Sequence, residues 1–207
     1  MFGEQSMAKI LDFKTKYAPK IFAIDPGFST KGGCGWAMIN TNAEYFGKEL
    51  NVPVIHRSGV IKPFSTASNL ITMSDICKKI EEIWRHDSGY SEEPAVLVIE
   101  QPEIYPNSPV RFSNISDLSI FVGMLLCSLS PKLTLAPTAR EWKGNKKKAD
   151  TQVEIEKIQD YHSKKALERD FSMIAIHNRH HIYDALGLGI YGAEVEFGSK
   201  PLPRLYL

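Results

Sequence analysis

Four side chains with the chemistry of metal ligands stand at the ends or on one face of predicted elements. Asp25 follows the apolar run Ile-Phe-Ala-Ile and Glu100 follows Val-Leu-Val-Ile, so each carboxylate ends a predicted strand. In open α/β sheets, ligands gather at these strand ends. His181 and Asp184 are three residues apart in a predicted helix and share one face of it. We expect the four side chains to form one cluster.

Such a cluster of anions needs a positive partner, because neighbouring carboxylates repel one another. Carboxylate oxygens suit Mg²⁺ or Mn²⁺, and two ions about 4 Å apart can serve both the attacking water and the leaving oxygen of a phosphodiester. The pattern therefore predicts a two-metal centre that hydrolyses phosphodiester bonds by in-line attack, without a covalent enzyme intermediate.

Each residue also has a simpler interpretation when it is taken alone. Asp25 precedes Pro-Gly and could be a turn former. His181 and Asp184 could belong to a solvated helix face, and with His177 and His180 nearby a zinc site is conceivable, although no cysteine or HxxxH pattern completes one. The functional interpretation depends on the joint arrangement.

The predicted elements place these residues in a mixed α/β domain. Strands are predicted at 20–24, 34–39, 54–61, 95–99 and 132–136, and helices at 65–85, 114–129, 138–143, 149–167 and 179–193. This order favours a five-stranded sheet, with three antiparallel strands followed by parallel ones, flanked by helices. We expect one domain over residues 20–207 and an N-terminal arm of unknown role over residues 1–19.

The composition is that of an ordinary globular protein. The 207 residues are 43% hydrophobic and 24% charged, and the net charge is +1, so a nucleic-acid partner must be met by local basic patches. The longest apolar stretch, residues 120–129, is too short to span a bilayer, and the three cysteines form no disulfide or zinc pattern. We expect a soluble, cytoplasmic protein, in the host cytoplasm if it is phage-encoded.

Three motifs carry a resemblance to a known family. They are Ile24-Asp25-Pro26-Gly27 with Ser29 and Gly35, then Ile99-Glu100-Gln101, and finally His181-Ile182-Tyr183-Asp184-Ala185-Leu186. Between them stand Ala136-Pro137, Gly144-Asn145 and Gln152-Val153. Over about residues 20 to 193 the chain resembles the RuvC-type Holliday junction resolvases of the ribonuclease H-like superfamily, as a divergent, possibly viral or phage, member.

The resemblance implies a ribonuclease H-like fold and a homodimeric, Mg²⁺-dependent endonuclease that cuts four-way DNA junctions with paired nicks. Asp25, Glu100, His181 and Asp184 would be the catalytic residues and the ligands of two ions, with Mn²⁺ as a substitute for Mg²⁺. The family's basic loop would correspond to Lys146, Lys147 and Lys148, and Lys143 and Arg111 are further candidates for DNA contact.

Two positions depart from the family pattern. Glu103 stands where the family has an aromatic residue at the junction centre, which leaves Tyr105 as the candidate substitute, and Asp150 stands where the family has a lysine. Selectivity for junctions is therefore less directly indicated than catalysis.

Other functions stay open. Another ribonuclease H-like nuclease, acting on flaps or RNA–DNA hybrids, is the nearest alternative, and a non-catalytic nucleic-acid-binding protein of this fold is another. A sugar-kinase-like ATP-binding domain would need a second phosphate motif after a strand, but the second Asp-x-Gly, at residues 87–89, follows a predicted helix.

Overall fold

The computed structural model describes most of the chain from residue 21 to residue 198. The described ranges are 21–29, 33–45, 48–63, 68–86, 94, 96–103, 112–144, 148–157 and 161–198. The predicted N-terminal arm at residues 1–19 lies outside them, so it stays a prediction.

The predicted mixed sheet is confirmed. Its strands are β1 (Ile21–Asp25), β2 (Cys34–Tyr45), β3 (Lys48–Ile61), β4 (Val96–Ile99) and β5 (Leu133–Leu135), in the spatial order β3-β2-β1-β4-β5. β1 pairs antiparallel with β2, and β2 pairs antiparallel with β3. β4 lies parallel to both β1 and β5. The three antiparallel strands thus precede the parallel ones, as expected.

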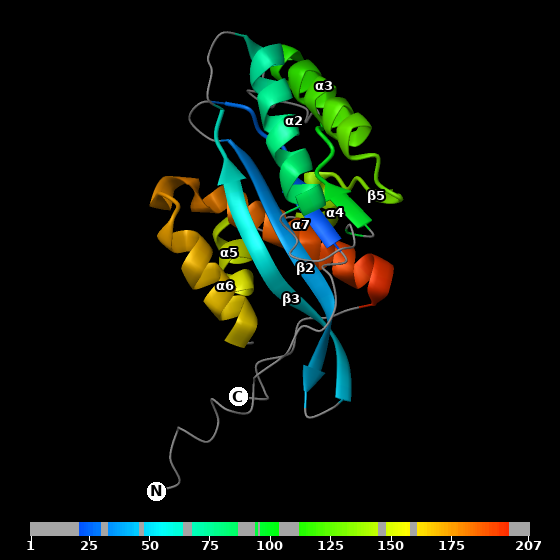
Figure 1. Cartoon of the computed structure of the whole chain (residues 1–207), viewed down its shortest axis with the longest axis vertical. Helices are drawn as coiled ribbons and strands as arrows, with labels where there is room; N and C mark the ends of the chain where they lie inside the picture. Colours follow the sequence, from blue (N-terminus) through cyan, green and yellow to red (C-terminus); the bar gives the residue numbers. More distant parts are fainter. Residues whose placement is uncertain are drawn as a thin grey trace, which may run out of the picture.

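The β2–β3 hairpin (Figure 1) is longer than predicted. The prediction ended the second strand at residue 39 and began the third at residue 54, but pairing continues as far as Tyr45 opposite Lys48. Register shifts follow Met38 and Asn40. Most residues of the sequence from 40 to 51 are polar, so no hydrophobic alternation marked the extension.

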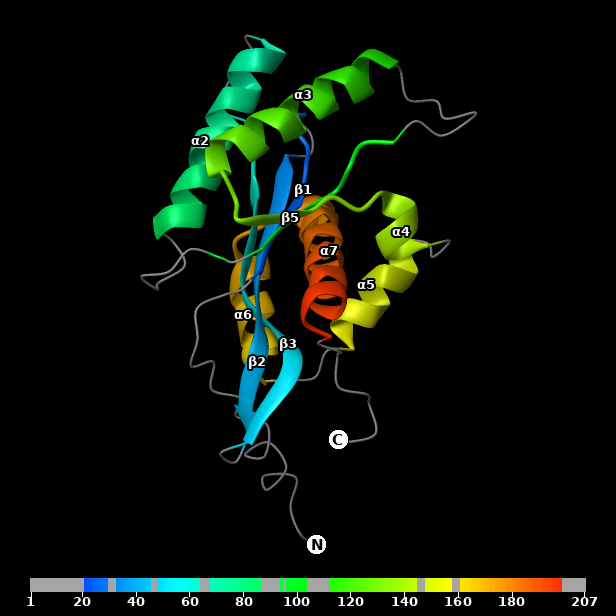
Figure 2. The ribbon, with the colours of Figure 1, turned by 90° about the vertical axis from the view of Figure 1, so that its right-hand side faces the viewer.

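Helices cover both faces of the sheet (Figure 2). On one face, α2 (Asn69–His86) and α3 (Phe112–Leu129) pack on alternate strand residues such as Phe22, Ile24 and Leu97. On the other, α7 (Arg179–Phe197) packs on the intervening residues Ala23, Ile39 and Val98. The period of two in β1 and β4, with both sets buried, is the pattern of a central strand between two helical layers.

The predicted helix at 149–167 is two helices, α5 (Lys148–Glu156) and α6 (Tyr161–Ser172). Few apolar residues mark this stretch, so the hydrophobic period could not show the interruption. The short helix η2 (Ile176–Asn178), which was not predicted, leads directly into α7.

Helix α6 packs along β3, the strand at one edge of the sheet. The backbone N–H of Ile55 in β3 donates to Ser163 Oγ (2.8 Å), and that of Ser58 donates to Asp170 Oδ2 (2.7 Å). Asp170 is buried, and Arg169 donates to its second oxygen (2.8 Å). Side chains of one helix thus satisfy backbone donors of the edge strand, which prevents that edge from pairing with another chain. In the described part of the chain, no helix combines the length and apolar character needed to cross a membrane.

Candidate metal centre

Asp25 and Glu100 lie side by side at one end of the sheet. Ile24 and Ile99, the residues before them, are register partners on the parallel strands β1 and β4, and the Glu100 N–H donates to the Ile24 carbonyl (3.2 Å). The carboxyl ends of two adjacent parallel strands therefore bring the acids together, as their positions in the sequence predicted.

α7 brings His181 to Asp25. Nδ1 of the imidazole and Oδ2 of the carboxylate share a hydrogen bond of 2.8 Å, and both side chains are largely buried. Gly35, the register partner of Asp25 on β2, makes this approach possible, because a Cβ at residue 35 would collide with the His181 carbonyl. Since a histidine that gives Nδ1–H to a carboxylate presents Nε2 as its acceptor, Nε2 is the nitrogen suited to an ion.

Asp184 is the most buried of the four acids and bases, with 7% of its surface exposed. Its Oδ1 lies 3.6 Å from the Lys143 ammonium, which is also largely buried. The sequence indicated Lys143 as a candidate DNA contact, which stays a prediction. In the structure its ammonium forms an ion pair with Asp184 inside the acidic cluster.

The surroundings of Glu100 disfavour the charged form of its carboxyl group. Burial, which is the largest cause, and the charges of Asp25 and Asp184 raise its pKa, while a hydrogen bond from Trp142 and the charge of Lys143 lower it, and together they bring the pKa to about 7. Two carboxylates and a low-polarity environment thus disfavour the ionised form. A cation among the three acids would reverse this balance.

Trp142 was missed by the sequence analysis. Its Nε1–H donates to Glu100 Oε2 (2.8 Å), and its ring lies on Gly187 of α7, where any side chain would displace the indole. Trp142 therefore contacts both halves of the cluster, the strand end that carries Glu100 and the helix that carries Asp184.

Helix α4 (Ala139–Lys143) holds Trp142 and Lys143 in this position. A capping box starts it, in which the Glu141 N–H donates to Thr138 Oγ1 and the Thr138 N–H donates to the Glu141 carboxylate (2.7 Å). The Gln101 N–H also donates to the Pro137 carbonyl (2.9 Å), which ties this start to the residue after Glu100. The capping pattern Thr-x-x-Glu was the available signal for a helix at this point.

The donor set fits a hard divalent cation, since it consists of three carboxylates and one imidazole. Within the described ranges, however, no three histidine, cysteine or acidic side chains already converge closely enough to hold an ion. Two of the acids already have partners inside the cluster, because Asp25 shares a hydrogen bond with His181 and Asp184 forms an ion pair with Lys143.

The other predicted DNA contacts lie outside this description. Tyr105, Arg111, Lys146 and Lys147 fall on residues that the structure does not describe, and Lys148 starts α5 without a described side chain. Their roles stay predictions.

Comparison with known proteins supports the architecture but not a close relationship. Scans against protein-family models and curated proteins find no match for the chain. Among solved structures, Thermus thermophilus RuvC is similar with a TM-score of 0.53 and 14% sequence identity over 88% of this chain and 99% of that one. RuvC from the same organism in complex with a Holliday junction substrate is similar with a TM-score of 0.50 and 13% identity, over 88% and 98%.

A third similar structure is the yeast mitochondrial Holliday junction resolvase Ydc2. Its TM-score is 0.54 at 12% identity, and the match covers 93% of this chain and 85% of that one. The strand order, the helical layers and these matches agree. The chain therefore has the ribonuclease H-like fold of the RuvC-type Holliday junction resolvases.

Proposed function

We propose that the chain is a divalent-metal-dependent endodeoxyribonuclease that cuts branched DNA, with the four-way junction as its substrate. The observation that carries the proposal is the cluster of Asp25, Glu100, His181 and Asp184 at the carboxyl end of the sheet. These residues come from three separate segments of the chain, and they meet in a fold shared with resolvases.

The ligands would be the carboxylates of Asp25, Glu100 and Asp184 and Nε2 of His181, holding two Mg²⁺ ions that Mn²⁺ can replace. Bound there, such ions activate water at neutral pH and offset the charge that develops on the phosphate. Asp25 also orients the His181 ring through its hydrogen bond, and Trp142 orients Glu100. Lys143 supplies positive charge beside Asp184 in the metal-free protein.

DNA beyond the cleaved phosphate would be contacted by Tyr105, Arg111 and the basic run Lys146 to Lys148. In the sequence the run follows α4, which carries Trp142 and Lys143, and ends at Lys148, the first residue of α5. Basic side chains in this segment would attract the anionic DNA backbone.

We further propose that the protein acts as a homodimer, because paired nicks in a four-way junction need two centres related by a two-fold axis. Three exposed apolar side chains are candidates for the contact between subunits. They are Leu70 and Ile71 of α2 and Ile120 of α3, which are 61%, 50% and 46% exposed. The two helices pack together, and Asn69 donates to Asp117 across them (2.8 Å).

The test is a panel of labelled substrates incubated with the purified protein in Mg²⁺, Mn²⁺ or EDTA. It contains a four-way junction, a flap, an RNA–DNA hybrid and a linear duplex. We expect metal-dependent, symmetrically paired nicks in the junction. Preferential cutting of the flap or the hybrid would instead assign the centre to another ribonuclease H-like nuclease, and no cutting of any substrate would contradict the proposal.

A further inference from the structure

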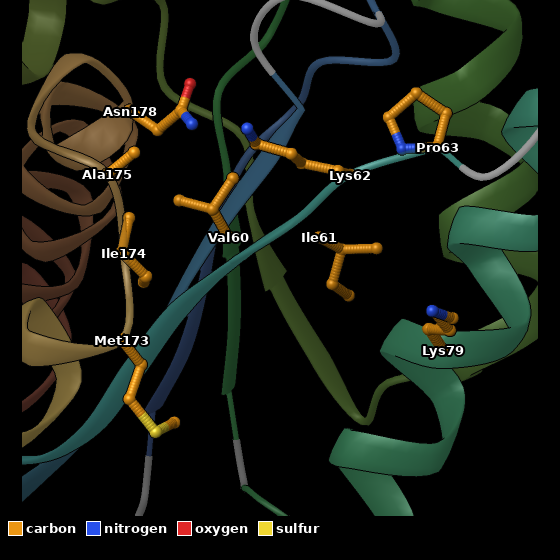
Figure 3. A pocket seen from close by; sticks show the side chains of 9 residues that line it. All are labelled: Val60, Ile61, Lys62, Pro63, Lys79, Met173, Ile174, Ala175 and Asn178. Atoms are coloured by element: carbon orange, nitrogen blue, oxygen red, sulfur yellow. The ribbon is translucent and has the colours of Figure 1, made fainter.

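A groove opens beside the candidate metal centre. It has a volume of about 640 Å³ and lies between the end of β3, α2, and the connection from α6 to α7. Figure 3 shows the nine side chains that line it, with Lys62 at the end of β3 and Lys79 on α2. None of the residues along this groove takes part in the cluster of Asp25, Glu100, His181 and Asp184.

The groove is close to Asp25. Gly35 is the register partner of both Asp25 on β1 and Val60 on β3, so Val60 lies two strand spacings from Asp25 in the same row of the sheet. At about 4.8 Å per spacing, the backbone separation is about 10 Å. Asn178, on the opposite wall, precedes His181 by three residues. The groove therefore lies next to the candidate metal centre.

The side chains that line the groove are complementary to a nucleic-acid strand with its phosphates. Lys62 and Lys79 contribute two ammonium groups, and no carboxylate is among the nine residues. Val60 and Ile174 contribute aliphatic side chains to the lining, and Met173 has 78% of its surface exposed. Such a surface pairs with phosphates through the lysines and with sugars or bases through its apolar part.

We propose that this groove binds the DNA strand that leaves the centre, within a few nucleotides of the cleaved phosphate, because the groove begins about 10 Å from Asp25. The proposal rests on the proposed nuclease function, and it names a contact surface that the four catalytic residues do not provide.

The salt dependence of junction binding tests the proposal, measured with the full chain in EDTA so that no cleavage occurs. Each phosphate contact contributes about 0.7 to 0.9 to the slope of log K against log salt. We expect Lys62→Ala and Lys79→Ala each to reduce the slope by that amount, and the double variant by about 1.4 to 1.8.

Lys78→Ala is the matched control. Lys78 is exposed on the same helix as Lys79, but one residue earlier, which turns it about 100° away from the groove. We expect its slope to equal that of the wild type. Thermal melting of all variants checks that each is folded before its slope is compared.

A photocrosslinking residue in place of Met173 gives a second, positional readout. We expect crosslinks to a junction strand within a few nucleotides of the cleavage position. An unchanged slope in the Lys62/Lys79 double variant, or crosslinks only elsewhere, would overturn the groove assignment while leaving the nuclease proposal intact. A wild-type protein that binds no DNA would instead contradict the nuclease proposal itself.

Discussion

Replacing Glu100 by Gln should stabilise the metal-free protein, and only at high pH. The ordinary pKa of a glutamate, 4.5, is raised to about 7 in the folded chain by burial and by Asp25 and Asp184. Between these values the folded protein holds a proton that the unfolded chain has released, so the folding free energy becomes less favourable as pH rises. At 1.36 kcal/mol per pH unit, the total loss is roughly 3 kcal/mol, complete by about pH 8.

Glutamine has nearly the same shape, keeps an oxygen that can accept the Trp142 N–H, and carries no charge. The free energy of unfolding should be measured by urea denaturation in EDTA, at pH 5 and at pH 8.5. The advantage of Glu100→Gln over the wild type should grow by roughly 3 kcal/mol between the two pH values. Mg²⁺ at pH 8.5 should stabilise the wild type and leave the variant nearly unchanged, because a ligand stabilises only the state that binds it.

Glu103→Gln is the control, since Glu103 is an exposed acid only three residues away. It should show no pH-dependent advantage. If the advantage of Glu100→Gln were equal at both pH values, Glu100 would carry no unfavourable charge in the folded protein, and the electrostatic argument for a cation site would be wrong.

Three further changes probe the same structure. Trp142→Phe should weaken Mn²⁺ binding about 10- to 100-fold by calorimetry without DNA, because the partner that orients Glu100 is lost. Trp84→Phe should leave Mn²⁺ binding unchanged, since the buried Trp84 indole N–H makes no hydrogen bond within the described part of the chain. Asp170→Ala should lower the free energy of unfolding by about 3 kcal/mol, since the Ser58 N–H is left buried and unpaired. If urea denaturation shows equal stability, the contact between α6 and β3 does not stabilise the fold. His181→Ala should be nearly inactive, whereas His181→Asp should shift the metal preference from Mn²⁺ toward Mg²⁺, because imidazole tolerates Mn²⁺ better. If the alanine variant cleaves at the wild-type rate in both metals, His181 is not a metal ligand.

The parts of the site that follow from strand order could be predicted from the sequence. Asp25 and Glu100 each end a continuous apolar run, and such runs become central parallel strands whose ends adjoin. The three-residue spacing of His181 and Asp184 placed both on one face of α7. These inferences use only local periodicity and the general geometry of sheets.

Other contacts depend on packing that local patterns do not encode. The Asp25–His181 hydrogen bond requires the close approach of α7 to Gly35, and the Trp142–Glu100 hydrogen bond requires an indole seated on Gly187. In both cases a glycine makes room for a residue distant in the sequence. The ion pair of Lys143 with Asp184 could not be predicted either, because it depends on the direction of α4.

The groove could not have been predicted for the same reason. Lys62 and Lys79 stand on separate elements, and only the packing of α2 and of the α6–α7 connection around the end of β3 brings them together. Nor did hydrophobic patterns reveal the far end of the β2–β3 hairpin, because most residues of the sequence there are polar.

The rate of cleavage of a four-way junction by the wild type and by Asp25→Asn tests the central claim most directly. Asparagine keeps the size of the side chain but removes the charge beside His181, so both proteins should fold and bind junction DNA alike. We expect paired, Mg²⁺-dependent nicks from the wild type and a loss of most cleavage in the variant. Cleavage by Asp25→Asn at the wild-type rate would show that the cluster of Asp25, Glu100, His181 and Asp184 is not the catalytic centre.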